Sequence, residues 1–449
     1  MKHIIKTIST PNPTISLPLN VLEKLLISDR DSITISIGAM KESVTLLHHD
    51  DRQQCIYLSN EIYNKFFLPD FIDVYEIAFD NETLIIGPVI GLLIRGKIDE
   101  LTKQRIKIYK NYLIDYKHLN GLILLFTLDG IDVKNKLVTG YAFNPKEHEW
   151  EEGIFPFPSV VFLRKPIKEV IRKKLTGLIG NKFFNSHVFN KWEMWEWLSD
   201  HEQIRKYLPE TVLGENIENV QRLIDAHQET FIKPKAGMQG SGIFQLSKVG
   251  QEYNLNYRIK DKNIITVLDN WQAVENYLKS EISLKNYIVQ QRIPLLTKDN
   301  RVMDVRVIVG KNHNGDWIVP GMVTKFGEID SIVSNISSGG SAQKVWKSLC
   351  DIFQNDFKKA FKKYMEIEKL AITCCKVLES KGLHLGYIGI DIGMDENHNL
   401  WLIEINNRSP DMTIALDAED YQLYYKIKSA PLHYAKWLSG LGGERQGGL

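Results

Sequence analysis

The sequence predicts a multidomain protein of mixed α+β and α/β class. With 449 residues the chain is too long for one ordinary hydrophobic core, so two to four domains are expected. Residues 1–95 are rich in short strand patterns, whereas the following stretch alternates between helical and strand patterns. Apolar residues make up 43% and charged residues 25% of the chain, which is typical of a soluble globular protein.

The composition also argues against several classes of function. The 56 basic and 55 acidic residues leave a formal net charge of +1, which gives no support for a nucleic-acid partner. The longest apolar run, Ile85 to Ile94, is short for a membrane span and contains glycine and proline, so no membrane insertion is expected. The N-terminus resembles no secretion signal, and the four cysteines lack the spacing of a zinc site. These features predict a reduced, cytoplasmic protein.

Residues 1–95 predict a β-rich N-terminal domain. The segment from Ile15 to Leu26 is followed by the alternating segment Ser32–Ile37, and Ile56–Phe67 is followed by Asp73–Ala78 in the same relative place. Strand, short helix and strand, repeated once, would suit a small pseudo-symmetric β-barrel. The alternative is that two strand-rich stretches align by chance.

The rest of the chain divides into three further parts. Residues 96–180 predict a small α/β domain with parallel strands, because the helical pattern Lys97–Lys117 precedes buried-strand runs such as Val160–Leu163. Residues 181–440 mix strands and helices and hold nearly all the recognisable chemistry. Residues 441–449 are glycine-rich and predict a flexible tail.

A glycine-rich segment lies between two predicted strands, the first ending at Lys233 and the second starting at Ile243. Glycines at 237, 240 and 242 allow backbone N–H groups to approach and cradle phosphate oxygens, and Lys233 adds a positive charge. No Gly-Lys-Ser/Thr follows, so the segment is not a Walker loop. The alternative is a flexible hairpin with an incidental lysine.

A predicted hairpin near the C-terminus carries acidic residues among isoleucines. Period-two alternation places Glu404 and Asn406 on one face, where Asp391 on the partner strand can meet them. Carboxylate and amide oxygens are the ligands that Mg²⁺ prefers. Acids among buried strand residues are costly unless a cation or hydrogen bonds compensate them. The alternative is a surface hairpin with solvated acids.

Together these motifs resemble those of the ATP-grasp superfamily over residues 96–440, in the order lysine with glycine loop, adenine hinge and metal-binding hairpin. More narrowly, the chain resembles the endospore-coat-associated YheC/YheD-like group, which appends an N-terminal β-rich region. The resemblance implies an ATP-grasp fold: two α+β subdomains clasp ATP, preceded by a small α/β pre-ATP-grasp domain. It also implies ATP and Mg²⁺ as cofactors, with two ions expected and Mn²⁺ as an alternative. The expected location is the cytoplasm, and the resemblance to the endospore-coat-associated group implies association with the spore coat as a second expected location.

The resemblance implies a nucleotide site residue by residue. Lys191 and Lys233 match lysines that contact the ATP phosphates, with an exposed helix lysine as the alternative for Lys191. Gln290 and the backbone of Gln291 to Ile293 match the adenine hinge, although relatives use glutamate at the Gln290 position and the ribose ligand stays open. The implied nucleotide-binding residues are Lys191, Lys233, Lys235, Gly237, Gly240, Ser241, Gly242, Gln290, Gln291, Ile293, Asn335, Gly339 and Gly340.

The same resemblance implies the catalytic and metal-binding residues. Arg306 matches the arginine of an Asp-x-Arg strand near the transferring γ-phosphate and forms, with Lys233, the implied catalytic pair. The alternative is an ordinary ion pair between Arg306 and Asp304. Asp391, Glu404 and Asn406 match the magnesium ligands of the family.

The implied activity is that of an ATP-dependent carboxylate–amine ligase. Such an enzyme forms an amide or peptide bond through an acyl phosphate and releases ADP and phosphate. The expected partners are small-molecule or peptide carboxylate and amine substrates, whose identities stay open. Three alternatives remain: a kinase that phosphorylates without ligation, a structural coat protein with vestigial nucleotide binding, and a ligase whose residues 1–95 recruit a peptide.

Overall fold

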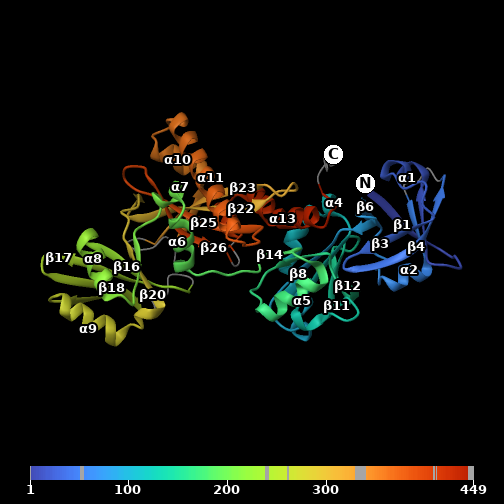
Figure 1. The fold of residues 1–449 in the computed structure, drawn as a ribbon. Helices are drawn as coiled ribbons and strands as arrows, with labels where there is room; N and C mark the ends of the chain where they lie inside the picture. Colours follow the sequence, from blue (N-terminus) through green and yellow to red (C-terminus); the bar gives the residue numbers. More distant parts are fainter. Residues whose placement is uncertain are drawn as a thin grey trace.

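The computed structural model describes residues 2–50, 55–237, 242–259, 262–328, 340–407, 410 and 412–442. These residues form four sheets that follow one another across the molecule, with the N-terminal barrel at one end and the sheet of residues 211–291 at the other (Figure 1). No helix among the described residues is long and apolar enough to cross a membrane.

The first sheet is a closed barrel in the order β1-β5-β2-β4-β3-β7-β6. After β1, the chain runs strand, short helix, strand, strand twice, as β2-α1-β3-β4 and as β5-α2-β6-β7. Its interior is filled by the apolar residues that alternate along these strands, such as Ile15, Leu17 and Ile35, which are all fully buried. The elements are β1 (Lys2–Ile8), β2 (Thr14–Pro18), α1 (Leu19–Leu25), β3 (Ser32–Ile37), β4 (Met40–His49), β5 (Cys55–Ser59), α2 (Asn60–Lys65), β6 (Val74–Asp80) and β7 (Thr83–Gly87).

The second sheet has the order β10-β11-β9-β8-β13-β14, with β12 paired to β11, and its central strands β8, β9 and β13 are parallel. These central strands are buried along their whole length, as expected where both faces are covered. The strands are β8 (Val89–Leu93), β9 (Leu122–Phe126), β10 (Ile131–Asp132), β11 (Leu137–Asn144), β12 (Glu149–Pro156), β13 (Val160–Leu163) and β14 (Phe183–Phe184). The helices are η1 (Ile98–Glu100), α3 (Lys103–Ile106), η2 (Lys107–Leu113), α4 (Tyr116–Leu119), η3 (Leu128–Gly130) and α5 (Glu169–Ile179).

Two sequence expectations need correction in this region. Strand β8 lies inside the predicted N-terminal region 1–95, yet it pairs with β9 and β13 of the second sheet, so this sheet begins before residue 96. The helical pattern over Lys97–Lys117 forms a series of short helical segments and not one continuous helix. The buried apolar residues of this stretch belong to several short helical turns. Their spacing alone does not show where one turn ends and the next begins.

The third sheet is antiparallel, in the order β15-β20-β16-β17-β18-β19. Helices α8 and α9 pack against it and share one hydrophobic core with it. Helices α6 and α7 precede it and pack against the fourth sheet. The elements are α6 (Lys191–Ser199), α7 (Glu202–Arg205), β15 (Thr211–Leu213), α8 (Ile217–His227), β16 (Glu229–Pro234), β17 (Phe244–Val249), β18 (Glu252–Ile259), β19 (Lys262–Leu268), α9 (Trp271–Glu281), η4 (Leu284–Asn286) and β20 (Tyr287–Gln291).

The fourth sheet has the order β24-β23-β22-β25-β26, with β21 paired to β22. Helix α11 packs on it in one core, and α13 lies in another core that this sheet shares with the second sheet (Figure 1). The elements are β21 (Thr297–Lys298), β22 (Arg301–Lys311), β23 (Trp317–Phe326), β24 (Ser341–Lys344), α10 (Val345–Ile352), α11 (Phe357–Ser380), β25 (Tyr387–Met394), β26 (Leu400–Asn406), α12 (Ile414–Asp417) and α13 (Tyr421–Leu438).

Candidate functional site

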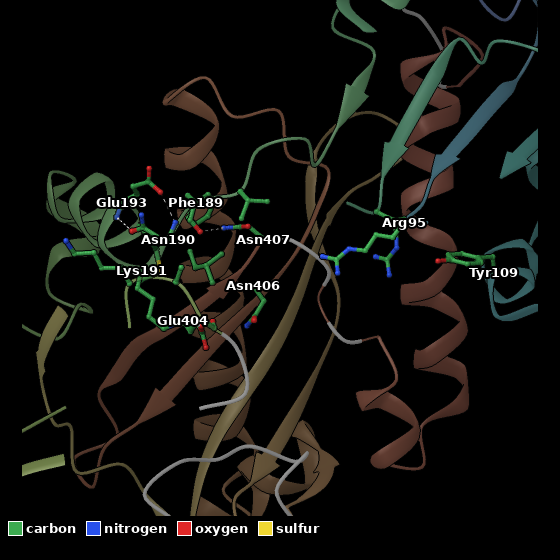
Figure 2. Close-up of a pocket in the computed structure, with 16 residues that line it drawn as sticks. Arg95, Tyr109, Phe189, Asn190, Lys191, Glu193, Glu404, Asn406 and Asn407 are labelled. Atoms are coloured by element: carbon green, nitrogen blue, oxygen red, sulfur yellow. Dashed lines mark hydrogen bonds and ion pairs between the residues drawn. The ribbon is translucent and has the colours of Figure 1, made fainter. Parts of the chain in front are cut away.

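Segments from the second, third and fourth sheets converge on one cavity of about 580 Å³. One wall follows the ends of strands β8 and β13, a second follows the end of β16 and the start of α6, and a third follows β26. Figure 2 shows Lys191, Glu404 and Asn406 on one side of this cavity, and Arg95 and Tyr109 across from them.

The N-terminus of helix α6 positions Lys191. Asn190 caps the helix by accepting hydrogen bonds from the backbone N–H groups of Trp192 and Glu193, and the Glu193 carboxylate accepts one from the Asn190 N–H in return. Fixed in this way, the Lys191 ammonium reaches Glu404, with 3.0 Å between Nζ and Oε1. The Lys191 N–H also donates to the carbonyl of Lys235 at 3.0 Å, which ties α6 to the end of β16.

Lys233 extends from β16 into the same region. Its Nζ donates to Oε1 of Gln290 on the paired strand β20 at 2.8 Å, and Gln290 in turn donates through Nε2 to Thr211 Oγ1 at 2.9 Å. Burial lowers the pKa of Lys233 to about 8; Lys191 also lowers it, whereas Glu404 opposes the shift. Lys233 therefore lies within electrostatic range of both members of the Lys191–Glu404 pair.

The acidic hairpin forms as the sequence pattern predicts. Asp391 on β25 lies directly opposite Glu404 on β26, and Asn406 donates through Nδ2 to Asp391 Oδ2 at 3.3 Å. All three side chains therefore share one face of the hairpin, whereas Ile390 and Ile405 are buried on the other.

Two cations compensate Asp391, which is only 4% exposed. Arg306 on β22 forms a two-point contact with its carboxylate, with 3.0 Å between Nη2 and Oδ2, and Lys325 on β23 lies 3.1 Å from the same oxygen. A Cβ at Gly389 would lie 3.2 Å from Arg306 Cδ, so the glycine leaves room for this arginine. Burial alone would raise the pKa of Asp391, but Arg306 and Lys325 hold it well below its usual value.

Lys325 is a site residue that the sequence analysis did not identify. It is 4% exposed and bridges Asp391 and Asp304, with 3.0 Å between its Nζ and Asp304 Oδ1. Burial would lower the pKa of Lys325, but Asp304 and Asp391 outweigh burial and raise it. Lys325 is the only charged residue in strand Trp317–Phe326, and a lone lysine in a buried strand was the signal that could have revealed it. Arg306 contacts Asp391, so its predicted alternative partner Asp304 is held by Lys325 instead.

The donor types of the hairpin fit a magnesium site. The described residues contain no group of three or more histidine, cysteine, aspartate or glutamate side chains that could hold a metal ion. The predicted magnesium ligands are instead two carboxylates, Asp391 and Glu404, and one amide, Asn406. Magnesium uses one or two carboxylates and completes its shell with water and phosphate oxygens, which this set allows. The Glu404 side chain is about one-third exposed towards the cavity, and its carboxylate forms an ion pair with the partly exposed Lys191.

The structure describes some of the remaining predicted residues, and others lie outside the described part of the chain. Lys235 and Gly237 line the cavity, and Gly242 has a φ of +73°, a left-handed conformation that favours glycine. Gly340 directly precedes β24. Gly240, Ser241, Asn335 and Gly339 lie outside the described residues.

Two backbone N–H groups and one side chain of the predicted adenine hinge form hydrogen bonds within the protein. The N–H of Gln291 donates to the Glu210 carbonyl at 2.8 Å, and that of Arg292 donates to the Glu229 carbonyl at 3.1 Å. The side chain of Gln290 is bonded to Lys233 and Thr211, as described above. The Ile293 carbonyl accepts a hydrogen bond from the Leu295 N–H at 2.9 Å, so the Ile293 N–H is the hinge group that stays a predicted contact to adenine.

The third and fourth sheets, each packed with helices, carry the lysines and the acidic hairpin of this site, and the family match shows that the chain is an ATP-grasp protein. Within that class the chain belongs to the YheC/D-like ATP-grasp family, whose family model matches residues 180–438. It is 24% identical over 403 residues to the endospore coat-associated protein YheD of Bacillus subtilis (strain 168), with 86% of each chain covered. It is 22% identical over 298 residues to the endospore coat-associated protein YheC of the same organism, covering 63% of this chain and 79% of that protein.

Two solved structures are also similar to the chain. The D-alanine-D-alanine ligase from Coxiella burnetii aligns with a TM-score of 0.41 and 13% identity, covering 77% of this chain and 96% of that chain. The ATP-grasp ligase PsnB, complexed with a phosphomimetic variant of its minimal precursor, Mg and ADP, aligns with a TM-score of 0.41 and 14% identity, covering 75% and 97%.

Proposed function

We propose that the chain is an ATP-dependent carboxylate–amine ligase that forms an amide or peptide bond through an acyl phosphate. The observation that carries this proposal is the contact between Lys191 and Glu404, because it joins the basic and the acidic parts of the predicted site in one wall of the cavity. Family membership supports ATP as the nucleotide.

The proposed reaction has two steps. An oxygen of the substrate carboxylate attacks the γ-phosphorus of ATP, the bond to the β-γ bridging oxygen breaks, and ADP leaves. The nitrogen of the amine then attacks the acyl carbon, phosphate leaves with the bonding electron pair, and the nitrogen loses a proton. Lys191 and Lys233 neutralise the phosphate charge, and Arg306, which is bonded to Asp391, stabilises the charge that develops on the transferring group.

Magnesium would be held by Glu404 and Asn406 together with Asp391, and when bound it would offset charge on the β- and γ-phosphates. The Lys191 ammonium forms an ion pair with the Glu404 carboxylate. We expect the ammonium to contact the triphosphate when ATP binds, which leaves the Glu404 carboxylate available to the metal. Asp391 keeps Arg306 and Lys325 as partners, so its role is to fix the arginine as well as to bind the cation.

No covalent intermediate on the protein is required. Cys374 and Cys375 are fully buried within α11, and burial raises the pKa of the Cys374 thiol to about 12 and that of Cys375 well above its ordinary value. Such thiols stay protonated and do not act as nucleophiles.

The test is an ADP-release assay of the full chain with Mg²⁺, ATP and a panel of amino acids, short peptides and cell extract, followed by mass analysis of products. An amide product whose formation needs both an acid and an amine supports the ligase. ADP release that is independent of any amine would instead identify a kinase.

A structural role in the spore coat is the second candidate. Two observations favour it: both curated relatives are named endospore coat-associated proteins, and Asp391 is already neutralised by Arg306 and Lys325 without a metal. We propose coat association for this chain as well, and catalysis and coat association are compatible. Failure of the wild-type chain to bind Mg²⁺ and a non-hydrolysable ATP analogue would favour a purely structural role.

A further inference from the structure

The wall of the cavity opposite Lys191 and Glu404 carries two arginines that the proposed chemistry does not use. Arg95 follows strand β8, and Arg164 follows strand β13. Tyr109, from η2, completes this wall, and Figure 2 shows Arg95 and Tyr109 across the cavity from Glu404 and Asn406. Both arginines lie outside residues 180–438, which the family model matches.

The topology of the second sheet brings the two arginines together. Strands β8 and β13 are parallel neighbours with Leu93 paired to Leu163, and the Arg164 N–H donates to the Leu93 carbonyl at 2.9 Å. Arg95 and Arg164 therefore leave the sheet at the same edge, the one formed by the carboxyl ends of its parallel strands. Side chains at this edge of an α/β sheet are well placed to bind a ligand.

The positive charge of this wall has no carboxylate partner within the part of the chain that the structure describes. The Arg164 Nε is buried without a hydrogen-bond partner there, and its guanidinium lies 5.6 Å from the ring centroids of both Tyr112 and Phe162. Arg95 is exposed to the cavity and forms no ion pair with a described residue. A buried guanidinium N–H without an acceptor is costly to maintain, which points to an acceptor that the chain itself does not supply.

The acids of the cavity are committed elsewhere. Glu193 accepts the hydrogen bond of the α6 cap, and Glu404 pairs with Lys191. Both arginines lower the pKa of the Tyr109 hydroxyl, although burial, the larger effect, raises it overall, so both lie within electrostatic range of this hydroxyl. Arg95, Arg164 and Tyr109 thus present two cations and one hydroxyl donor to the same space.

We propose that Arg95, Arg164 and Tyr109 form a subsite for a second anionic group of the substrate, a carboxylate or a phosphate. This group is distinct from the carboxylate that is activated and from the nucleotide phosphates, which are assigned to the opposite wall. The proposal rests on the proposed ligase function and narrows its substrates to acids with a further anionic group, such as a dicarboxylic acid, an acidic peptide or a phosphorylated acid.

The test is calorimetric titration of the full chain, saturated with Mg²⁺ and ADP, with glutarate, with its monoamide glutaramate and with inorganic phosphate. We expect glutarate or phosphate to bind the wild-type protein. The double variant Arg95→Gln/Arg164→Gln is expected to weaken that binding by at least about tenfold. Preference for glutarate over glutaramate identifies a carboxylate subsite, and preference for phosphate identifies a phosphorylated substrate.

Matched controls separate this subsite from general charge and from the nucleotide site. Lys173→Gln/Lys174→Gln on α5 removes the same charge from exposed positions and is expected to leave anion binding unchanged. ADP affinity is expected to change by less than about twofold in both double variants. If Arg95→Gln/Arg164→Gln does not fold, the exposed single change Arg95→Gln and the change Tyr109→Phe carry the test, and each is expected to weaken anion binding.

Three results would overturn the subsite: no anion binding by the wild-type chain, equal binding by the arginine variant, or loss of ADP affinity in that variant, which would assign the arginines to the nucleotide. Failure of the proposed ligase function is a separate result. It is seen as absence of ADP binding and turnover in the wild-type chain, and the glutarate titration of nucleotide-free protein still tests the subsite.

Discussion

The Lys191 ammonium lies 3.0 Å from the Glu404 carboxylate and joins the start of helix α6 to strand β26. Both residues are partly exposed to the cavity, and Lys233 lies within their electrostatic range. Each side chain of this pair neutralises the charge of the other.

Glu404→Gln and Lys233→Ala are each expected to lower ADP release by at least about a hundredfold, since each removes a charge that the transferring phosphoryl group requires. The measurement is steady-state ADP release with a substrate found in the screen. Glu196→Gln, an exposed change on α6, is the control and is expected to be neutral. Wild-type rates in either site variant, with the fold intact by circular dichroism, would remove the catalytic assignment.

Nucleotide affinity is expected to fall as the pH rises through about 8, the value to which burial lowers the pKa of Lys233. Below that pH Lys233 is charged and attracts the triphosphate. Above it, binding must take up a proton, because the phosphates raise the pKa of this lysine in the complex, so the affinity decreases. Calorimetry with Mg²⁺ and a non-hydrolysable ATP analogue from about pH 6.5 to about pH 9.5 measures this profile. Lys233→Arg should abolish the inflection, and an identical profile in that variant would show that Lys233 is not its source.

Lys325→Met is expected to destabilise the full chain by about 3–5 kcal/mol, because Asp304 and Asp391 would share one buried counter-ion. Lys344→Met is the matched control, since Lys344 forms a more exposed pair with Asp420 at 3.6 Å and its loss should cost less than about 1 kcal/mol. Urea unfolding of both variants gives the comparison. Equal stabilities would indicate that the buried network contributes little to the fold.

Asn185→Ala is expected to destabilise the chain by at least about 2 kcal/mol. Asn185 is 3% exposed, and its Oδ1 accepts hydrogen bonds from the N–H groups of Gly386 at 2.8 Å and Tyr387 at 3.1 Å, which ties the end of the second sheet to β25. Its φ of +57° is a conformation that asparagine tolerates better than most residues. Asn181→Ala, at an exposed position in the same segment, is the control for urea unfolding. A loss no larger than that of the control would contradict the proposed tie.

Much of the fold class followed from local patterns. The acidic hairpin was predictable because alternation along β26 fixes which face Glu404 and Asn406 share, and the apolar residues between them demand burial. The resemblance to the ATP-grasp superfamily, and within it to the YheC/YheD-like group, is confirmed by the match over residues 180–438.

The parts that could not be predicted depend on contacts between distant segments. Lys325 and Arg306 meet Asp391 only because β22 lies between β23 and β25, an order that no local pattern reveals. Arg95 and Arg164 line the same cavity because two parallel strands end at the same edge, although an entire α/β segment separates them in the chain. The pairing of strand β8 with β9 is equally invisible to local patterns, since a buried apolar strand carries no mark of its partners.

The most direct test of the central claim is a crystal structure of the full chain with Mg²⁺ and a non-hydrolysable ATP analogue. The account predicts the triphosphate in the cavity between α6 and β26, with Lys191 released from Glu404 to contact phosphate oxygens and Glu404 and Asn406 bound to the metal. A nucleotide bound elsewhere, or a Lys191–Glu404 contact that stays closed with the nucleotide present, would contradict it.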